Sequence, residues 1–369
     1  ASALAAGGKL FNTVFGLDYH VALAIGAAVI LCYTFMGGFM AVCVTDFVQG
    51  TLMLIGLLVV PLVAYFLLPG NLTDLITQSG VTGGAGAYLN PFINGDRPYT
   101  FVEIFSQLAW GFGYCGMPHV LVRFMAVRSE KELKKSWVIA IIWDLLSLTA
   151  AFAIAVIGRA YLLPTILGEN GAASSESVFI EMIRKVFTSQ LALPFIGGLF
   201  LCGILAAIMS TADSQLLVTA SAVSEDLYHS FIKKDADSKE ILRVSRITVI
   251  VIAIIAFAIA WDPNSSIMGL VSNAWAGLGA AFGPIVVMSL FWRRTNLQGA
   301  IAGMVTGGLT VIIWDYIPLV GGQTLGTYTG LYSLAVGFLL SLVVIVIVSL
   351  LTKAPSKEIT DEFDKVAAK

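Results

Sequence analysis

Nine apolar blocks of membrane-spanning length dominate this chain of 369 residues. A helix needs about 20 predominantly apolar residues to cross the hydrocarbon core of a bilayer. The blocks are close to this length and lie at residues 19–39, 47–68, 100–121, 137–158, 192–222, 244–261, 266–292, 298–316 and 328–351. Only 12% of the residues are charged, against about 25% in a typical soluble domain. We therefore expect the chain to cross a membrane several times.

Each block is predicted to be a helix. In lipid every backbone polar group needs a partner within the protein, so a spanning segment is either a helix or a strand of a closed barrel. Barrel strands alternate apolar and polar side chains over about ten residues, a pattern that this sequence lacks. The predicted fold class is all-α, a polytopic bundle of about nine transmembrane helices.

Lysine and arginine are distributed unequally between the two sets of loops. If the helices alternate in direction, only five of the 21 basic residues fall on one side, and these are Lys9, Arg97, Arg159, Arg184 and Lys185. Cytoplasmic loops carry the excess of positive charge. We therefore expect a plasma (inner) membrane protein with a cytoplasmic C-terminus. Residues 1–352 would form the transmembrane domain and residues 353–369 a cytoplasmic tail.

Residues 110–119, which read WGFGYCGMPH, interrupt the third block with three glycines and one proline. Such a broken helix marks solute sites in transporters, because the freed backbone groups can coordinate a ligand. Trp110, Tyr114 and Pro118 are spaced i, i+4, i+8, which places them on one stripe of any remaining helix. We interpret them as the wall of a site for a small amphipathic solute. The alternative is a glycine-rich packing face, which is common in membrane helices.

Hydroxyl groups gather in the middle of the fifth block. Ala207, Ser210, Thr211 and Ser214 follow the spacing i, i+3, i+4, i+7, which places them on one helical face beside Asp213. A hard cation such as sodium binds to oxygen ligands of this kind. Alternatively, the hydroxyls bond back to carbonyls of their own helix. The carboxylate of Asp213 is harder to explain structurally, because a charge within a membrane is costly.

Asp46 begins the second block. One interpretation is a helix cap, since aspartate is favoured at a helix N-terminus. The other is a functional carboxylate. No set of His, Cys, Asp and Glu has the spacing of a metal site, and no nucleophile–base pair suggests an enzyme. The net charge of −2 gives no reason to expect a nucleic-acid partner.

Several stretches together resemble the sodium:solute symporter family, and most closely its sodium/proline branch. They are residues 33–39 (YTFMGGF) with Thr45-Asp46, residues 110–114 with Pro118-His119 and residues 123–126 (RFMA), residues 206–211 (AAIMST), residues 225–228 (EDLY), residues 269–272 (GLVS), and residues 275–284 (WAGLGAAFGP). They occur in the family's order over nearly the whole chain. This chain differs from the proline carriers of that branch at two places. The carriers read Phe-Gly-Gln-Pro where this chain has Cys115-Gly116-Met117-Pro118, and they read Ser-Cys where this chain has Asp213-Ser214.

The resemblance implies a LeuT-like inverted-repeat fold and sodium-driven uptake of a small solute, with L-proline expected and membrane lipid as the surrounding solvent. It assigns Ala207, Ser210 and Thr211 as sodium ligands and Trp110, Tyr114 and Pro118 as the solute wall. It also suggests a part in sodium coupling for Asp46, Asp213 and Ser214. On this template the first three helices and the start of the fourth would precede Ala1, so we expect the chain to be the C-terminal portion of the family domain.

Two other functions remain open at this point. The solute could be a different amino acid or pantothenate. The chain could also be the membrane domain of a sensor protein, because similar domains precede histidine kinases, although the tail after Leu351 is short.

Overall fold

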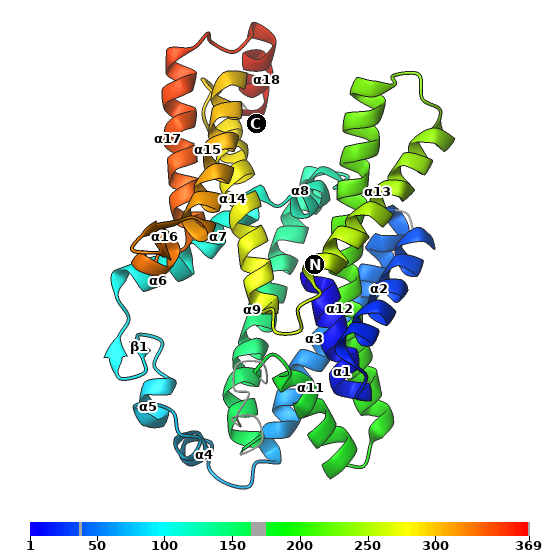
Figure 1. Ribbon diagram of the computed structural model, residues 1–369, viewed down its shortest axis with the longest axis vertical. Coiled ribbons are helices and arrows are strands. Elements are labelled where there is room, and N and C mark those ends of the chain that lie inside the picture. The colour runs from blue at the N-terminus through cyan, green and yellow to red at the C-terminus, as the bar shows by residue number, and fades with distance from the viewer. Residues whose placement is uncertain (37–38, 164–174, 368–369) are drawn as a thin grey trace. The chain divides into compact units, whose positions relative to one another are not determined.

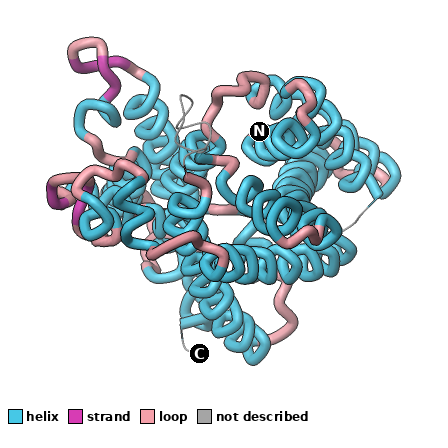
Figure 2. The backbone as a smooth tube through the Cα atoms, turned by 90° about the horizontal axis from the view of Figure 1, so that it is seen from below, coloured by secondary structure: helices cyan, strands magenta, loops and turns pink. Residues whose placement is uncertain are grey.

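The computed structural model describes residues 1–36, 39–163 and 175–367. Within these ranges nearly all regular structure is helical, and strands occur only in short hairpins (Figure 2). One hairpin pairs β1 (Ile93–Asn94) with β2 (Arg97–Pro98), and the other pairs β3 (Pro318–Val320) with β4 (Gln323–Thr324). The predicted all-α class is confirmed.

The chain divides into two compact units, each made of two segments. Unit 1 comprises Ala1–Arg97 and Val127–Leu270, and unit 2 comprises Pro98–Ala126 and Val271–Lys369. The elements of unit 1 are α1 (Ser2–Phe15), α2 (Tyr19–Met36), α3 (Phe39–Phe66), α4 (Leu72–Gln78), α5 (Gly84–Tyr88), α9 (Glu130–Tyr161), α11 (Val178–Ile183), η3 (Arg184–Gln190), α12 (Pro194–Ser221), η4 (Ala222–Ile232) and α13 (Ser238–Ile259).

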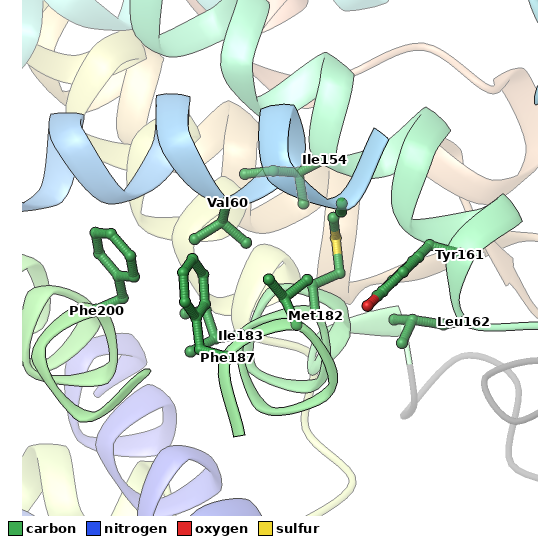
Figure 3. Close-up of a cluster of buried hydrophobic side chains, with 10 residues drawn as sticks. Val60, Ile154, Tyr161, Leu162, Met182, Ile183, Phe187 and Phe200 are labelled. Atoms are coloured by element: carbon green, nitrogen blue, oxygen red, sulfur yellow. The ribbon is translucent and has the colours of Figure 1, made fainter. Parts of the chain in front are cut away.

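The core of unit 1 joins helices that are far apart in the sequence. Val60 of α3 and Ile154 of α9 pack against Met182 of α11, and Phe187 and Phe200 complete the cluster with rings 5.0 Å apart (Figure 3). These side chains are almost fully buried, so the cluster excludes both lipid and water. It fixes α12 against α3, and both helices carry residues of the predicted sodium site.

The connection between α9 and α11 is attached to α1 by an ion pair. Lys9 Nζ lies 2.5 Å from Glu176 Oε2 and donates to the carbonyl of Ser265 at 2.8 Å. The second carboxylate oxygen of Glu176 accepts from the backbone N–H of Ile267, at 2.9 Å. One glutamate therefore links α1 to the start of α14 (Ile267–Phe291) within unit 1.

Unit 2 contains the broken third block and the last spans. Its elements are α6 (Phe101–Leu108), α7 (Trp110–Gly113), η1 (Tyr114–Gly116), α8 (Pro118–Met125), the greater part of α14, α15 (Leu297–Tyr316), α16 (Leu325–Thr329), α17 (Ser333–Leu351) and α18 (Lys357–Ala367).

Helices α14, α15 and α17 run alongside one another in unit 2 (Figure 1). Gly299, Gly303 and Gly307 allow α15 to approach both neighbours closely. A Cβ at Gly303 would lie 2.2 Å from a side-chain carbon of Ile345 on α17, and one at Gly307 would lie 2.0 Å from the carbonyl oxygen of Ala280 on α14. Small residues at such contacts are typical of helix packing in membranes.

Seven helices are long and apolar enough to cross a membrane, and an eighth candidate is the pair of α1 and α2, which is bent by 120°. These counts refer to the ranges that the structure describes. The count of seven or eight is lower than the predicted number of about nine transmembrane helices for two reasons. Block 19–39 runs into residues 37–38, which lie outside the described ranges, and block 100–121 is divided into four short helices.

Candidate solute and sodium sites

The break predicted in the third block is present in unit 2. The helix tightens to a 3₁₀ turn at Tyr114–Gly116, and Met117 then adopts an extended conformation with φ −85° and ψ 110°. Pro118 starts the next helix, a position where its missing N–H costs no hydrogen bond. Gly116 is required because a Cβ there would lie 2.7 Å from the carbonyl oxygen of Leu278 on α14. The break is therefore built into the packing of α14.

Aromatic rings cover the broken segment from α14. The indole of Trp275 stacks on Trp110 at 5.2 Å between ring centroids and meets Tyr114 edge-on at 4.8 Å. Its N–H donates to the carbonyl oxygen of Trp110 at 2.9 Å. Tyr332 also lies nearly parallel to Trp110, at 6.3 Å. Tyr114 remains about half exposed, so one face of this aromatic wall is accessible.

Two of the three residues predicted for the solute wall lie close together in the structure. Trp110 and Tyr114 contact the same indole, as their spacing along one stripe suggested. Pro118 lies beyond the extended residue Met117, as the first residue of α8, so helical spacing no longer relates it to the other two.

The three predicted sodium ligands share one face of α12. The hydroxyls of Ser210 and Thr211 both donate to the carbonyl oxygen of Ala207, at 3.1 and 3.2 Å. The alternative in which these hydroxyls bond to their own helix therefore holds in this structure. The same geometry gathers three oxygen atoms at one point, and each hydroxyl keeps lone pairs that can face a cation.

Asp213 lies two residues after Thr211 on α12 and is fully buried. Its Oδ1 accepts from the hydroxyl of Thr34 on α2, while its Oδ2 has no hydrogen-bond partner among the described residues. The Thr34 hydroxyl also contacts the carbonyl oxygen of Ile30 at 2.8 Å. A hydroxyl carries a single hydrogen, so it cannot satisfy both acceptors at full strength. Among the described residues, therefore, Asp213 Oδ2 and one of the two acceptors beside Thr34 lack a full hydrogen bond.

Asp46 joins the same cluster from α3, since the hydroxyl of Ser214 donates to its Oδ2 at 3.3 Å. The capping interpretation of Asp46 is wrong, because α3 begins at Phe39 and Asp46 lies about two turns inside it. Thr34, Asp46, Asp213 and Ser214 therefore form one group of oxygen atoms at the meeting of α2, α3 and α12. We call it the carboxylate cluster.

Comparison with known proteins identifies the chain at this point. The model of the sodium:solute symporter family matches residues 1–307. The chain belongs to the sodium:solute symporter family. It is therefore a multi-pass membrane transporter that couples solute movement to sodium, and not an enzyme.

Curated relatives of this symporter match almost the whole chain. The high-affinity proline transporter PutP of Bacillus subtilis is 40% identical over 99% of the chain and 72% of its own length. The osmoregulated proline transporter OpuE of the same species is 42% identical over 97% of the chain and 68% of its length. Sodium/proline symporter 2 of Staphylococcus saprophyticus is 41% identical over 99% of the chain and 69% of its length.

A solved structure supports the fold. A Na⁺-coupled sialic acid symporter in a substrate-bound, outward-open state matches 96% of this chain and 72% of its own, with a TM-score of 0.69 and 18% identity. The LeuT-like fold expected from the resemblance is thus confirmed. The report of that structure describes a novel Na⁺ site in the sialic acid symporter.

Three residues of these sites escaped the sequence reasoning. Thr34, Trp275 and Tyr332 each reach their site from a segment distant in the sequence, and none stands in a local pattern of breakers or mid-span charges. Trp275 and Thr34 do lie in stretches that resemble the family, which is the one signal that could have drawn attention to them.

Proposed function

We propose that this symporter takes up L-proline together with sodium, with its C-terminus on the cytoplasmic side. The observation that carries the proposal is the 40–42% identity, over at least 97% of the chain, to several proteins named as proline transporters. The proposed orientation rests on the excess of lysine and arginine in one set of loops. In this proposal residues 1–352 are the transmembrane domain and residues 353–369 the cytoplasmic tail.

The solute wall is formed by Trp110, Tyr114 and Pro118 in this proposal. Proline offers an apolar ring and a charged amine and carboxylate, so it suits a site with apolar walls and a few polar groups. The half-exposed ring of Tyr114 supplies an apolar face, and the extended backbone at Met117 interrupts regular helical bonding. Backbone groups at such a break are available to polar parts of a solute.

The coupling sodium is held by Ala207, Ser210 and Thr211, through the backbone carbonyl of the alanine and the two hydroxyls. Their oxygen atoms already converge within 3.2 Å of the Ala207 carbonyl. Small rotations of the hydroxyl hydrogens would turn their lone pairs toward a cation. Oxygen ligands of this kind suit a hard cation.

The carboxylate cluster contributes to sodium coupling at a second position. Two carboxylates in an apolar span are costly unless a positive charge or a proton compensates them. The buried Oδ2 of Asp213, which has no partner among the described residues, supports such a role. We assign Asp46, Asp213 and Ser214 to this position, with Thr34 as the donor that orients Asp213.

Uptake by reconstituted vesicles tests the proposal. Labelled L-proline should accumulate when an inward sodium gradient is imposed and should stay at equilibrium when choline replaces sodium. Excess unlabelled proline should abolish the signal, whereas pantothenate should leave it unchanged. Competition by pantothenate or another amino acid, with no effect of proline, would assign the transporter to a different solute. Uptake that is independent of sodium would contradict the coupling itself.

A further inference from the structure

Trp275 contacts the broken segment through its ring faces, its ring edge and its indole N–H. Its indole stacks on Trp110, meets Tyr114 edge-on and donates a hydrogen bond to the Trp110 carbonyl oxygen. It also lies directly over Gly113, where an added Cβ would be 2.0 Å from the indole nitrogen. One side chain of α14 therefore touches α7 and η1 at consecutive turns.

We propose that Trp275 is a positioning residue that holds the broken segment in the geometry that binds solute. The proposal rests on the function proposed above, because it assigns the solute wall to Trp110 and Tyr114. Trp275 acts through these two residues. It fixes the orientation of the Trp110 ring by stacking on it and that of the Tyr114 ring by an edge contact. Tyr332, the residue before α17, supports the same stack, and its hydroxyl donates to the carbonyl oxygen of Ser272 at 2.7 Å.

The physical reason lies in the break itself. A regular helix fixes its side chains through its own hydrogen bonds, whereas a short α7 followed by a 3₁₀ turn and an extended residue has few such bonds. The rings of Trp110 and Tyr114 consequently need an external support. The indole N–H supplies a directional bond to the backbone, and stacking supplies a contact that depends on ring orientation.

The test compares Trp275→Phe with Trp314→Phe. Each change removes one indole hydrogen bond to a backbone carbonyl, of 2.9 Å for Trp275 and 3.0 Å for Trp314, and both residues lie in unit 2. Trp275→Phe should raise the half-saturating proline concentration about fivefold, the size expected for one hydrogen bond. The maximal rate and the sodium dependence at saturating proline should remain unchanged. Trp314→Phe should leave the proline dependence unaltered.

A second measurement does not depend on the identity of the solute. Cys115 lies in η1 next to Tyr114 and is partly buried, so its rate of modification by a small thiol reagent reports the geometry of the broken segment. The background replaces the other cysteines, Cys32, Cys43 and Cys202, by alanine. Trp275→Phe should change the Cys115 rate several-fold, and Trp275→Leu, which also loses the stacking, should change it more.

The outcomes separate the two proposals. If Cys115 reactivity responds to Trp275→Phe but the parent protein does not transport proline, the positioning role stands and the solute assignment fails. If both variants, Trp275→Phe and Trp314→Phe, shift proline affinity and Cys115 reactivity equally, Trp275 is only a packing residue. Unchanged reactivity and unchanged proline dependence in Trp275→Phe would also overturn the positioning role.

Discussion

Replacing Gly307 with alanine should destabilise unit 2 by a large margin. Gly307 lies on α15 where this helix crosses α14, and an added Cβ would lie 2.0 Å from the carbonyl oxygen of Ala280 and 2.6 Å from its carbonyl carbon. Both contacted atoms belong to the α14 backbone. No side-chain rotation can relieve the clash, so the two helices must move apart.

The magnitude follows from the geometry. Contacts of a Cβ closer than 3.0 Å essentially do not occur, so the helices would separate by about 1 Å at the crossing. Overpacking of this kind costs about 1–3 kcal/mol, and a rigid backbone obstacle favours the upper end. Alanine regains about 1 kcal/mol over glycine as a helix former. The expected net loss is about 2 kcal/mol in the free energy of unfolding.

The neighbouring glycine provides a matched control. A Cβ at Gly308 would meet only the Cβ of Ala281, at 4.0 Å, an ordinary contact distance. Gly308→Ala gains the same helix propensity without the clash, so it should be neutral or slightly stabilising. The comparison uses the thermal midpoints of both variants in detergent micelles. Each midpoint is obtained from the fraction of protein that remains monodisperse after heating. Equal midpoints for Gly307→Ala and Gly308→Ala would refute the close contact of α14 and α15.

Three further predictions concern the proposed sites and the connection between α9 and α11. Tyr114→Ala should raise the half-saturating solute concentration about tenfold, or 1.4 kcal/mol, in uptake assays at matched expression. Thr34→Val should lower the free energy of unfolding by about 1–3 kcal/mol, and with it the thermal midpoint, because it removes a hydrogen-bond donor from the buried Asp213. Thr34→Ser keeps the hydroxyl and should leave the midpoint unchanged. Burial raises the pKa of Glu176, but the Lys9 ammonium and backbone and hydroxyl donors outweigh it and hold the pKa below its usual value of 4.5. The stabilisation is therefore present at neutral pH and lost as pH falls through the lowered pKa, and Glu176→Gln should remove this part of the pH dependence of the midpoint.

Each of these predictions has a clear contrary result. An unchanged concentration dependence in Tyr114→Ala would remove this ring from the solute wall. Equal midpoints for Thr34→Val and the parent would mean that the threonine hydroxyl does not support Asp213. A pH profile of Glu176→Gln that matches the parent would show that the ion pair with Lys9 contributes nothing to stability.

The sequence predicted the membrane fold and the break in the third block because both depend on local composition. Apolar blocks of about 20 residues without the alternation of barrel strands are helices in lipid, and three glycines with one proline within ten residues weaken the helix at residues 110–119. The exact form of the break could not be predicted, since α14 determines it by closing on Gly113 and Gly116. The same holds for Pro118, whose place on a common stripe assumed a continuous helix.

The carboxylate cluster shows the corresponding limit for the proposed sodium site. Helical spacing correctly placed Ala207, Ser210 and Thr211 on one face of α12. Local sequence could not decide whether Asp46 caps a helix, because the answer depends on where α3 begins. Nor could it pair Thr34 with Asp213, since the two lie 179 residues apart and meet only through the packing of α2 against α12.

The central claim is that solute binding is coupled to sodium at α12. The most direct test is to measure how proline binding depends on sodium in the Thr211→Val variant. Coupling between two ligands is reciprocal, so sodium strengthens proline binding by the same factor as proline strengthens sodium binding. The variant loses one of the two hydroxyl groups that converge at the Ala207 carbonyl but leaves the residues of the proposed solute wall unaltered. Proline affinity is measured at a series of sodium concentrations in the parent and in Thr211→Val. We predict that half-maximal sodium rises at least about tenfold in the variant and that saturating sodium restores the parent's proline affinity. An unaltered sodium dependence in Thr211→Val would contradict the account and leave Ser210 and Thr211 as residues bonded only to their own helix.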